Sequence, residues 1–128
     1  MSYYLNKILN SSFEETIKKV LEELKKEGFG IITEIDVQAT LKNKIGVDFR
    51  NYRILGACNP SFAYQALQVE DKIGTMLPCN VIVQSLDDKR TEVAAIDPLL
   101  AMGRLDNQGL LQIARQVQGK LKNVIDRL

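Results

Sequence analysis

The chain has 128 residues, of which 45% are hydrophobic and 26% are charged, and its formal net charge is +1. Such a chain is long enough to bury a core as a single domain over residues 1–128, without a disulfide or metal to stabilise it. The near-neutral charge argues against a duplex nucleic-acid binder, and no stretch has the length of a membrane span.

The chain contains two cysteines, no histidine and no tryptophan. Residues 1–7 lack the apolar run of a signal peptide, so we expect a cytoplasmic protein whose two thiols are reduced. Without histidine, serine–histidine catalysis is excluded. The two thiols are therefore the only soft nucleophiles available for covalent or metal chemistry.

The first third of the chain predicts a strand, a helix and a second strand. Residues 3–9 indicate a short strand, and Ser12 followed by Glu15 is a capping-box pattern at a helix start. Apolar residues then recur at helical spacing until Gly28, which can supply the left-handed residue that ends a helix. Residues 30–37 alternate with period two and include β-branched residues, which predicts a strand with one buried face.

That alternation puts Ile31, Thr33 and Ile35 on the buried face of the strand. Glu34 and Asp36 are then expected on the opposite face, about 7 Å apart. This spacing is compatible with an acid–base pair, but it also occurs on any solvated strand face. We therefore expect the sheet face away from the helices to be partly polar.

The rest of the chain predicts further elements in the order helix, strand, helix, strand, strand, helix. Residues 38–45 indicate a short helix that stops at Gly46, and residues 52–58 a strand. Asn59 is expected to cap the next helix by accepting from its free amides, with Pro60 at the first helical position. Residues 70–77 form a connector. Residues 79–86 and 90–97 are expected to form a hairpin, followed by an unusually apolar loop at 99–103 and a last helix from 107 to the end.

This order of elements predicts an α+β fold in two layers. The two long helices are expected to pack on one face of a mostly antiparallel sheet.

Three segments, GFGIITEIDV (28–37), YRILGACNP (52–60) and LPCNV (77–81), resemble the family called domain of unknown function 302. The resemblance covers nearly the whole chain. It implies a two-layer β-α-β4-α domain with a topology similar to the TATA-binding-protein half-repeat, usually seen as a homodimer. It implies no established activity, and it does not transfer DNA binding, because a fold does not determine a function.

Cys58 and Cys79 are the candidate catalytic residues, and each is followed by an asparagine, Asn59 and Asn80. Cys58 directly precedes a predicted helix start, where the helix dipole can lower the pKa of a thiol and activate it. The alternative is that Cys58 is a small packed residue at a strand end. Cys79 opens a strand and has no such local cause. It matters only if the fold brings it near Cys58, where a disulfide requires Cα atoms within about 7 Å.

Charged residues give a second, polar candidate site. It combines the carboxylates with two arginines, Glu34, Asp36, Asp48, Asp97, Arg50 and Arg53. The alternative is that these residues form ordinary solvated surfaces, and that Asp97 with Pro98 simply ends a strand. We expect no cofactor and no metal site within one chain, since two thiols fall short of the four ligands of structural zinc. A dimer could supply four thiols across its two-fold axis.

Three functions remain open from the sequence, and whether the protein is an enzyme is one of the open questions. The first is a homodimeric module that binds a small ligand or partner near the 58–60 turn and Cys79. The second is a thiol-dependent redox or sulfur-handling protein that uses Cys58, with Cys79 as the resolving thiol. The third is an assembly module whose apolar 99–102 segment is buried by a dimer partner.

Overall fold

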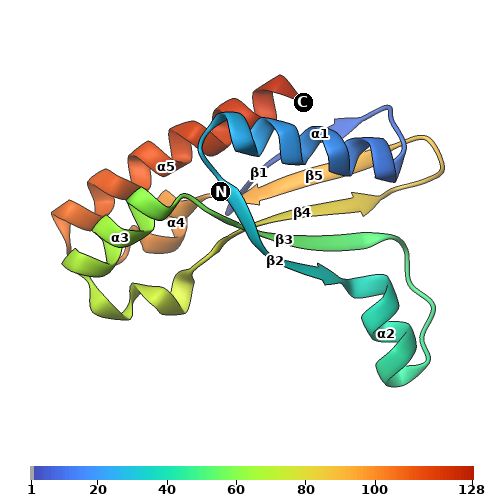
Figure 1. Cartoon of the computed structure of the whole chain (residues 1–128), viewed down its shortest axis with the longest axis horizontal. Helices are drawn as coiled ribbons and strands as arrows, with labels where there is room; N and C mark the ends of the chain where they lie inside the picture. The colour runs from blue at the N-terminus through green and yellow to red at the C-terminus, as the bar shows by residue number, and fades with distance from the viewer. Residues whose placement is uncertain (1) are drawn as a thin grey trace.

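Five antiparallel strands form one sheet in the order β1-β5-β4-β3-β2 (Figure 1). The computed structural model describes residues 2–128. The strands are β1 (Tyr4–Leu9), β2 (Gly30–Asp36), β3 (Tyr52–Cys58), β4 (Cys79–Ser85) and β5 (Thr91–Ile96). The helices are α1 (Phe13–Lys26), α2 (Val37–Ile45), α3 (Pro60–Val69), α4 (Pro98–Met102) and α5 (Gln108–Arg127), with a 3₁₀ segment η1 (Asp71–Met76).

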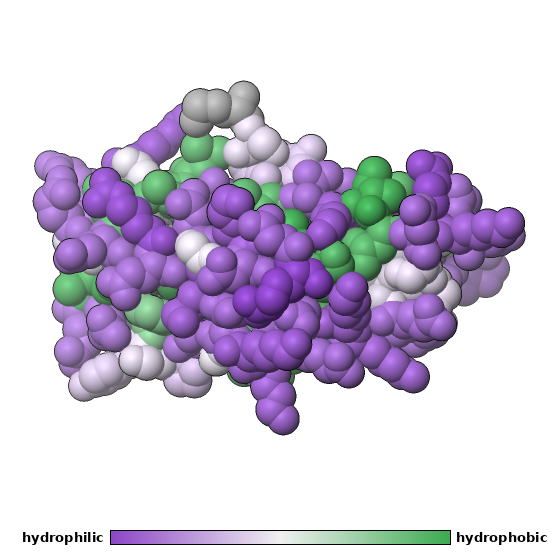
Figure 2. Space-filling view, turned by 90° about the horizontal axis from the view of Figure 1, so that it is seen from above, coloured by the Kyte–Doolittle hydropathy of each residue, from purple (hydrophilic) through white to green (hydrophobic). Residues whose placement is uncertain are grey.

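The two long helices, α1 and α5, cover one face of the sheet (Figure 1). Their apolar stripes meet the inward residues of the central strands, and Val20, Leu24, Leu55, Val81 and Leu121 are all fully buried. The outer sides of α1 and α5 are polar, and Figure 2 shows a mostly hydrophilic surface on this side of the molecule. The two-layer α+β arrangement that the sequence predicts is therefore confirmed. Among residues 2–128, the helices include none with the length and hydrophobicity needed to cross a membrane.

The helix ends follow the local signals of the sequence. The Ser12 hydroxyl accepts from the Glu15 amide at the start of α1, and Gly28 follows the helix with φ 84°. Asp36 caps α2 by accepting from the Ala39 amide, and Gly46 ends that helix in the left-handed region with φ 69°. Both glycines occupy a conformation that other residues adopt only with strain.

A bulge in β2 overturns the predicted placement of Glu34 and Asp36. Ile31 pairs with Ala57, but Thr33 already pairs with Gly56, so the extra residue between them shifts the alternation by one position. Glu34 and Asp36 therefore lie on the helix side of the sheet. Thr33 and Ile35 lie on the uncovered side, and Ile35 is exposed rather than buried.

The apolar segment after β5, predicted as a loop at residues 99–103, is largely helical. Residues 98–102 form α4, which packs against α5 in the same chain. Met102 is buried there in a second apolar cluster with Ala66, Ile73, Leu110 and Ala114. Packing within the chain thus accounts for the apolar character of this segment.

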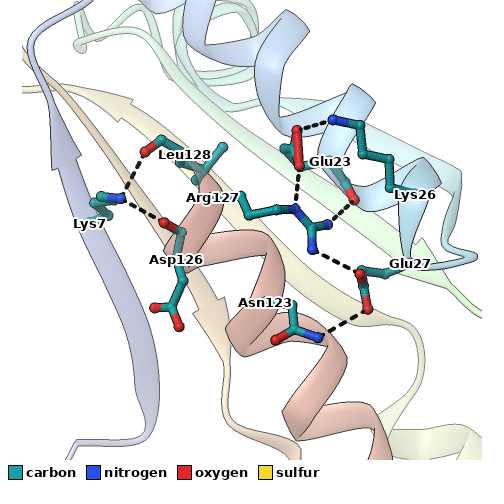
Figure 3. A network of polar contacts seen from close by, with 8 residues as sticks. All are labelled: Lys7, Glu23, Lys26, Glu27, Asn123, Asp126, Arg127 and Leu128. Carbon is teal, nitrogen blue, oxygen red and sulfur yellow. Dashed lines mark hydrogen bonds and ion pairs between the residues drawn. The ribbon is translucent and has the colours of Figure 1, made fainter.

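Arg127 near the end of α5 ties that helix to α1 (Figure 3). Its Nε donates to Glu23 Oε1 at 2.6 Å and its Nη1 donates to Glu27 Oε2 at 3.0 Å. Lys26 binds the other oxygen of Glu23 at 2.7 Å, so this buried carboxylate has a cation on each oxygen. The hydrogen bonds from Lys26 and Arg127 hold the pKa of Glu23 below its usual value.

Lys7 of β1 ties the sheet to the same helix end. Its Nζ donates to the backbone oxygens of Asp126 at 3.1 Å and Leu128 at 2.7 Å (Figure 3). A cation at a helix C-terminus also complements the helix dipole. Strand β1, α1 and α5 are therefore joined at one corner of the molecule.

Replacing Arg127 is expected to lower the stability of the fold in a pH-dependent way. Because the folded pKa of Glu23 lies below its ordinary value of 4.5, the network contributes its full stability above that pH and loses it as the pH falls through the lowered pKa. The melting temperature of Arg127→Ala should therefore lie furthest below wild type near pH 7, and the gap should narrow below about pH 4.

Thermal melts by circular dichroism between pH 3 and pH 7 measure this gap. Lys122→Ala, which removes an exposed ion pair with Asp126 on the same helix, is the control and should change little. A gap for Arg127→Ala that is equally wide at pH 3 and pH 7 would contradict the role assigned to Glu23.

Gly56 lies at a point of close packing on the uncovered side of the sheet. A Cβ at this position would overlap the Thr33 hydroxyl and lie 2.8 Å from Pro78 Cγ. Gly56→Ala should therefore destabilise the protein by about 1–3 kcal/mol, the usual cost of overpacking. Gly30→Ala is the matched control, because a Cβ there meets no atom within 4 Å. Urea unfolding of both variants checks the prediction, and equal midpoints would contradict it.

Candidate functional site

A cavity of about 240 Å³ lies at one end of the sheet, and we call it the end cavity. Its walls come from the ends of β3 and β4 and from α3, α4 and α5, and nearly all of its lining is apolar. The lining residues are Phe29, Ile32, Ala57, Cys58, Asn59, Phe62, Ala63, Ala66, Leu77, Pro78, Cys79, Pro98, Met102, Ile113, Ala114 and Val117. Several belong to the main core under α1 and others to the second cluster under α4, so the cavity lies where the two clusters meet.

Both cysteines line the end cavity, so the fold brings the two candidate thiols to one site. Cys79 pairs with Ala57 on the neighbouring strand, and Cys58 is the next residue after Ala57. The pleat directs Cys79 and Ala57 to the helix side, and Cys58 follows on the other side of the pleat. No disulfide joins them. Cys58 is half-buried and Cys79 is buried.

Burial governs the chemistry of Cys79. Desolvation, and secondarily the nearby Cys58, raise the pKa of the Cys79 thiol to about 11. At neutral pH Cys79 is therefore a protonated thiol, which behaves as a small apolar group with a weak S–H donor. This property does not suit a resolving nucleophile.

Asn59 precedes α3 as predicted, but its side chain does not cap that helix. The α3 start lacks a side-chain cap bond, and the Asn59 amide instead donates to the Glu27 carbonyl oxygen at 3.3 Å. Asn59 Nδ2 would also lie 3.0 Å from a Cβ at Gly28. Asn59 therefore joins the last turn of α1 to the first turn of α3, and it holds one wall of the end cavity in position.

The polar candidates Glu34, Asp36 and Arg53 do lie together, but they form a site of their own. Arg53 Nη1 is 3.0 Å from Glu34 Oε1, and Arg53 Nε is 4.0 Å from Asp36 Oδ2. Arg53 also lies over the Phe13 ring at 5.6 Å. None of the three lines the end cavity, and each carboxylate is matched by the arginine. The cluster is thus an ion-pair surface, in which Asp36 additionally caps α2.

The remaining candidates are separated from one another. Asp97 caps α4 by accepting from the amides of Leu99 and Leu100, and it also accepts from Gln118 at 2.9 Å. Asp48 pairs with Lys42 on the surface. Asn80 is exposed on the uncovered face of the sheet, opposite Gly56. Asp48 and Asp97 therefore do not join the cluster of Glu34, Asp36 and Arg53 in one polar pocket, as was predicted.

A row of polar side chains crosses the uncovered face of the sheet. Arg50 Nε donates to Gln84 Oε1 at 2.9 Å, and Gln84 Nε2 donates to Glu92 Oε1 at 2.8 Å. Asn6 Nδ2 donates to the other oxygen of Glu92 at 2.8 Å. Of these four residues, only Arg50 was predicted from the sequence as a site residue. The sequence does contain a signal for Gln84 and Glu92, because the alternation along the β4–β5 hairpin places both on one face of the sheet.

Residues 2–128 hold no group of three or more histidine, cysteine, aspartate or glutamate side chains in an arrangement that could bind a metal ion. The two thiols of the end cavity are therefore the only soft ligands at this site within the described chain.

Comparison with known proteins supports the resemblance noted in the sequence. No curated protein matches the chain. A crystal structure of an uncharacterized conserved DUF302 protein from Bacillus stearothermophilus is 29% identical in sequence, with a TM-score of 0.90 over 99% of this chain and 98% of that chain. The family model for DUF302, a domain of unknown function, matches residues 5–128. On this evidence the chain belongs to the DUF302 family.

Proposed function

We propose that this protein is a homodimeric binding module that takes a small apolar ligand into the end cavity, beside Cys58 and Cys79. The observation that carries the proposal is the cavity itself, at about 240 Å³ with an almost wholly apolar lining. A smaller apolar cavity of about 150 Å³ is sufficient to bind benzene in another protein. Ligand sites typically combine such a lining with a few polar groups, and here Asn59 and the half-buried Cys58 thiol are those groups.

The size and chemistry of the cavity restrict the ligand class. About 240 Å³ lies just below the usual range for drug-sized ligands, which favours a compact aromatic or branched aliphatic molecule. A ligand with a buried charge is disfavoured, because Phe62, Ile113 and Val117 offer no partner for it. A reducing compartment such as the cytoplasm would keep both thiols free for contact with the ligand.

Thiol chemistry is the second candidate, and the burial of Cys79 weakens it. A two-cysteine redox mechanism needs a resolving thiol that ionises, whereas the pKa of Cys79 is raised to about 11. A mechanism that uses Cys58 alone remains compatible with its half-buried position.

Ligand binding in the end cavity should raise the melting temperature of the protein. Indole and benzyl alcohol serve as compact aromatic probes, and stabilisation by about 2–3 kcal/mol is expected at a concentration near 100 times the dissociation constant. Ala63→Leu fills part of the cavity and should abolish the shift, while Ala101→Leu on the exposed side of α4 should keep it. Equal shifts in both variants would place the binding elsewhere, and no shift with any compact apolar probe would contradict the proposal.

Alkylation should distinguish the two thiols. At pH 8 only about one Cys79 thiol in a thousand is ionised, and this residue is also buried. Iodoacetamide should therefore modify Cys58 first, with Cys79 reacting only after unfolding in guanidinium chloride. Peptide mass spectrometry measures the order. Faster modification of Cys79 in the folded protein would contradict its placement in the cavity wall.

A further inference from the structure

The face of the sheet opposite α1 and α5 carries large apolar side chains with no helix over them. Tyr4, Ile8 and Ile35 point to this face and remain 38%, 51% and 47% exposed. Ile54 and Ile82 lie between them on β3 and β4 and pair with each other. Large apolar side chains gathered on one sheet face, beside the polar row of Arg50, Gln84, Glu92 and Asn6, indicate an interaction surface.

Two opposite charges on this face lack an ionic partner. Arg50 donates to the neutral side chain of Gln84, and Glu92 accepts only from the neutral amides of Gln84 and Asn6. Within residues 2–128, no oppositely charged group lies at ion-pair distance from either Arg50 or Glu92. Gln84 lies between the two charges and contacts both.

The order of the strands makes this charge pattern self-complementary. β4 is the central strand, so a two-fold axis along β4 in the plane of the contact exchanges β5 with β3 and β1 with β2. Gln84 then lies at the axis. Glu92 is directly opposite Gln84 on β5, and Arg50 reaches Gln84 from the β3 side. The rotation therefore brings Arg50 of one subunit opposite Glu92 of the partner subunit.

We propose that the uncovered sheet face binds a second copy of this chain about a two-fold axis along β4, with Arg50 paired to Glu92 of the partner subunit. The contact is isologous, so it contains this ion pair twice and closes at two subunits. Two sheets that pack face to face keep their strands nearly aligned, as this axis requires. The inference rests on the homodimer of the proposed function and specifies its interface.

The extent of the face can be compared with what a stable dimer buries. Five strands of six or seven residues cover a plan of roughly 24 by 20 Å, about 480 Å², from the standard strand spacing and rise. This plan is about 60% of the roughly 800 Å² that each partner buries in a standard interface, and the relief of the side chains and the exposed helix α2 add to it.

Helix α2 gives an independent reason for a second copy. It has no buried residue in its own chain and projects beyond the β2 edge, away from α1 and α5 (Figure 1). Ile45 and Val47 at its end are 66% and 44% exposed. The pairing register puts the start of α2 at the level of Ile8 on β1. Because the axis exchanges β2 with β1, α2 comes beside the exposed Ile8 of the partner subunit.

Charge reversal tests the proposed pairing, with the dimer dissociation constant measured by sedimentation velocity over a concentration series. Arg50→Glu and Glu92→Arg each place like charges opposite one another twice, and each should raise the dissociation constant at least about tenfold. The double variant Arg50→Glu/Glu92→Arg restores opposite charges and should recover most of the loss. Arg115→Glu on the exposed side of α5 is the control for a charge reversal on the helix layer and should leave the constant unchanged.

Ile82→Asp provides a second test near the axis, because it puts two carboxylates into the apolar centre of the contact. It should give a monomer with a wild-type circular dichroism spectrum, since Ile82 lies outside the core of its own chain.

A dimer that survives both Ile82→Asp and the single reversals would overturn the assignment of the face while leaving the homodimer intact. Wild type that sediments as a monomer at micromolar concentration would overturn the homodimer as well. Failure of the double variant to recover, with dissociation by the single variants, would overturn the Arg50–Glu92 pairing.

Discussion

The sheet has two faces, but both long amphipathic helices of the chain cover the same one. The rest of the structure depends on this uneven cover. α1 and α5 bury the helix-side residues of the central strands, which form the main core. Burial of this kind is the dominant favourable contribution to folding. The Arg127–Glu23 contact and the Lys7 contacts then fix the two helices to each other and to the edge strand β1. The other face of the sheet is left without cover from its own chain.

The end cavity follows from the way the shorter elements complete the helix layer. α3, α4 and the first turns of α5 form a second apolar cluster beside the sheet, and this cluster meets the main core without filling the junction. Asn59 holds the end of α1 against the start of α3 and so maintains this junction. The two cysteines lie in its wall because β3 ends and β4 begins at the same edge of the sheet. Their joint position is thus a consequence of strand pairing, and the burial of Cys79 favours contact with a ligand over nucleophilic chemistry.

Differences between the sequence predictions and the structure have specific physical causes. Three helices, α1, α2 and α5, and the β4–β5 hairpin were predictable, because each has its own periodicity, cap or turn. The side of the sheet on which Glu34 and Asp36 lie was not predictable. One additional residue between Ile31 and Thr33 inverts the alternation, and this bulge leaves no local signal in the sequence. The role of Asn59 was also mispredicted, since its amide finds the Glu27 carbonyl, a partner 32 positions earlier in the chain. The apolar residues 99–102, predicted as a loop, belong to the helix α4, which packs against α5 in the same chain.

The amino-acid sequence was enough to predict the order of the elements, the two-layer class and the apolar stripes of the long helices. These features depend on contacts within a few residues or on a pattern that spans the whole chain. The face that each strand residue occupies, the meeting of the two thiols at a cavity between two apolar clusters, and the shared uncovered face of Arg50 and Glu92 emerged only from the folded chain. These features depend on strand register and on packing between distant segments, which a one-dimensional pattern does not specify, because a shift of one residue moves every following side chain to the opposite face.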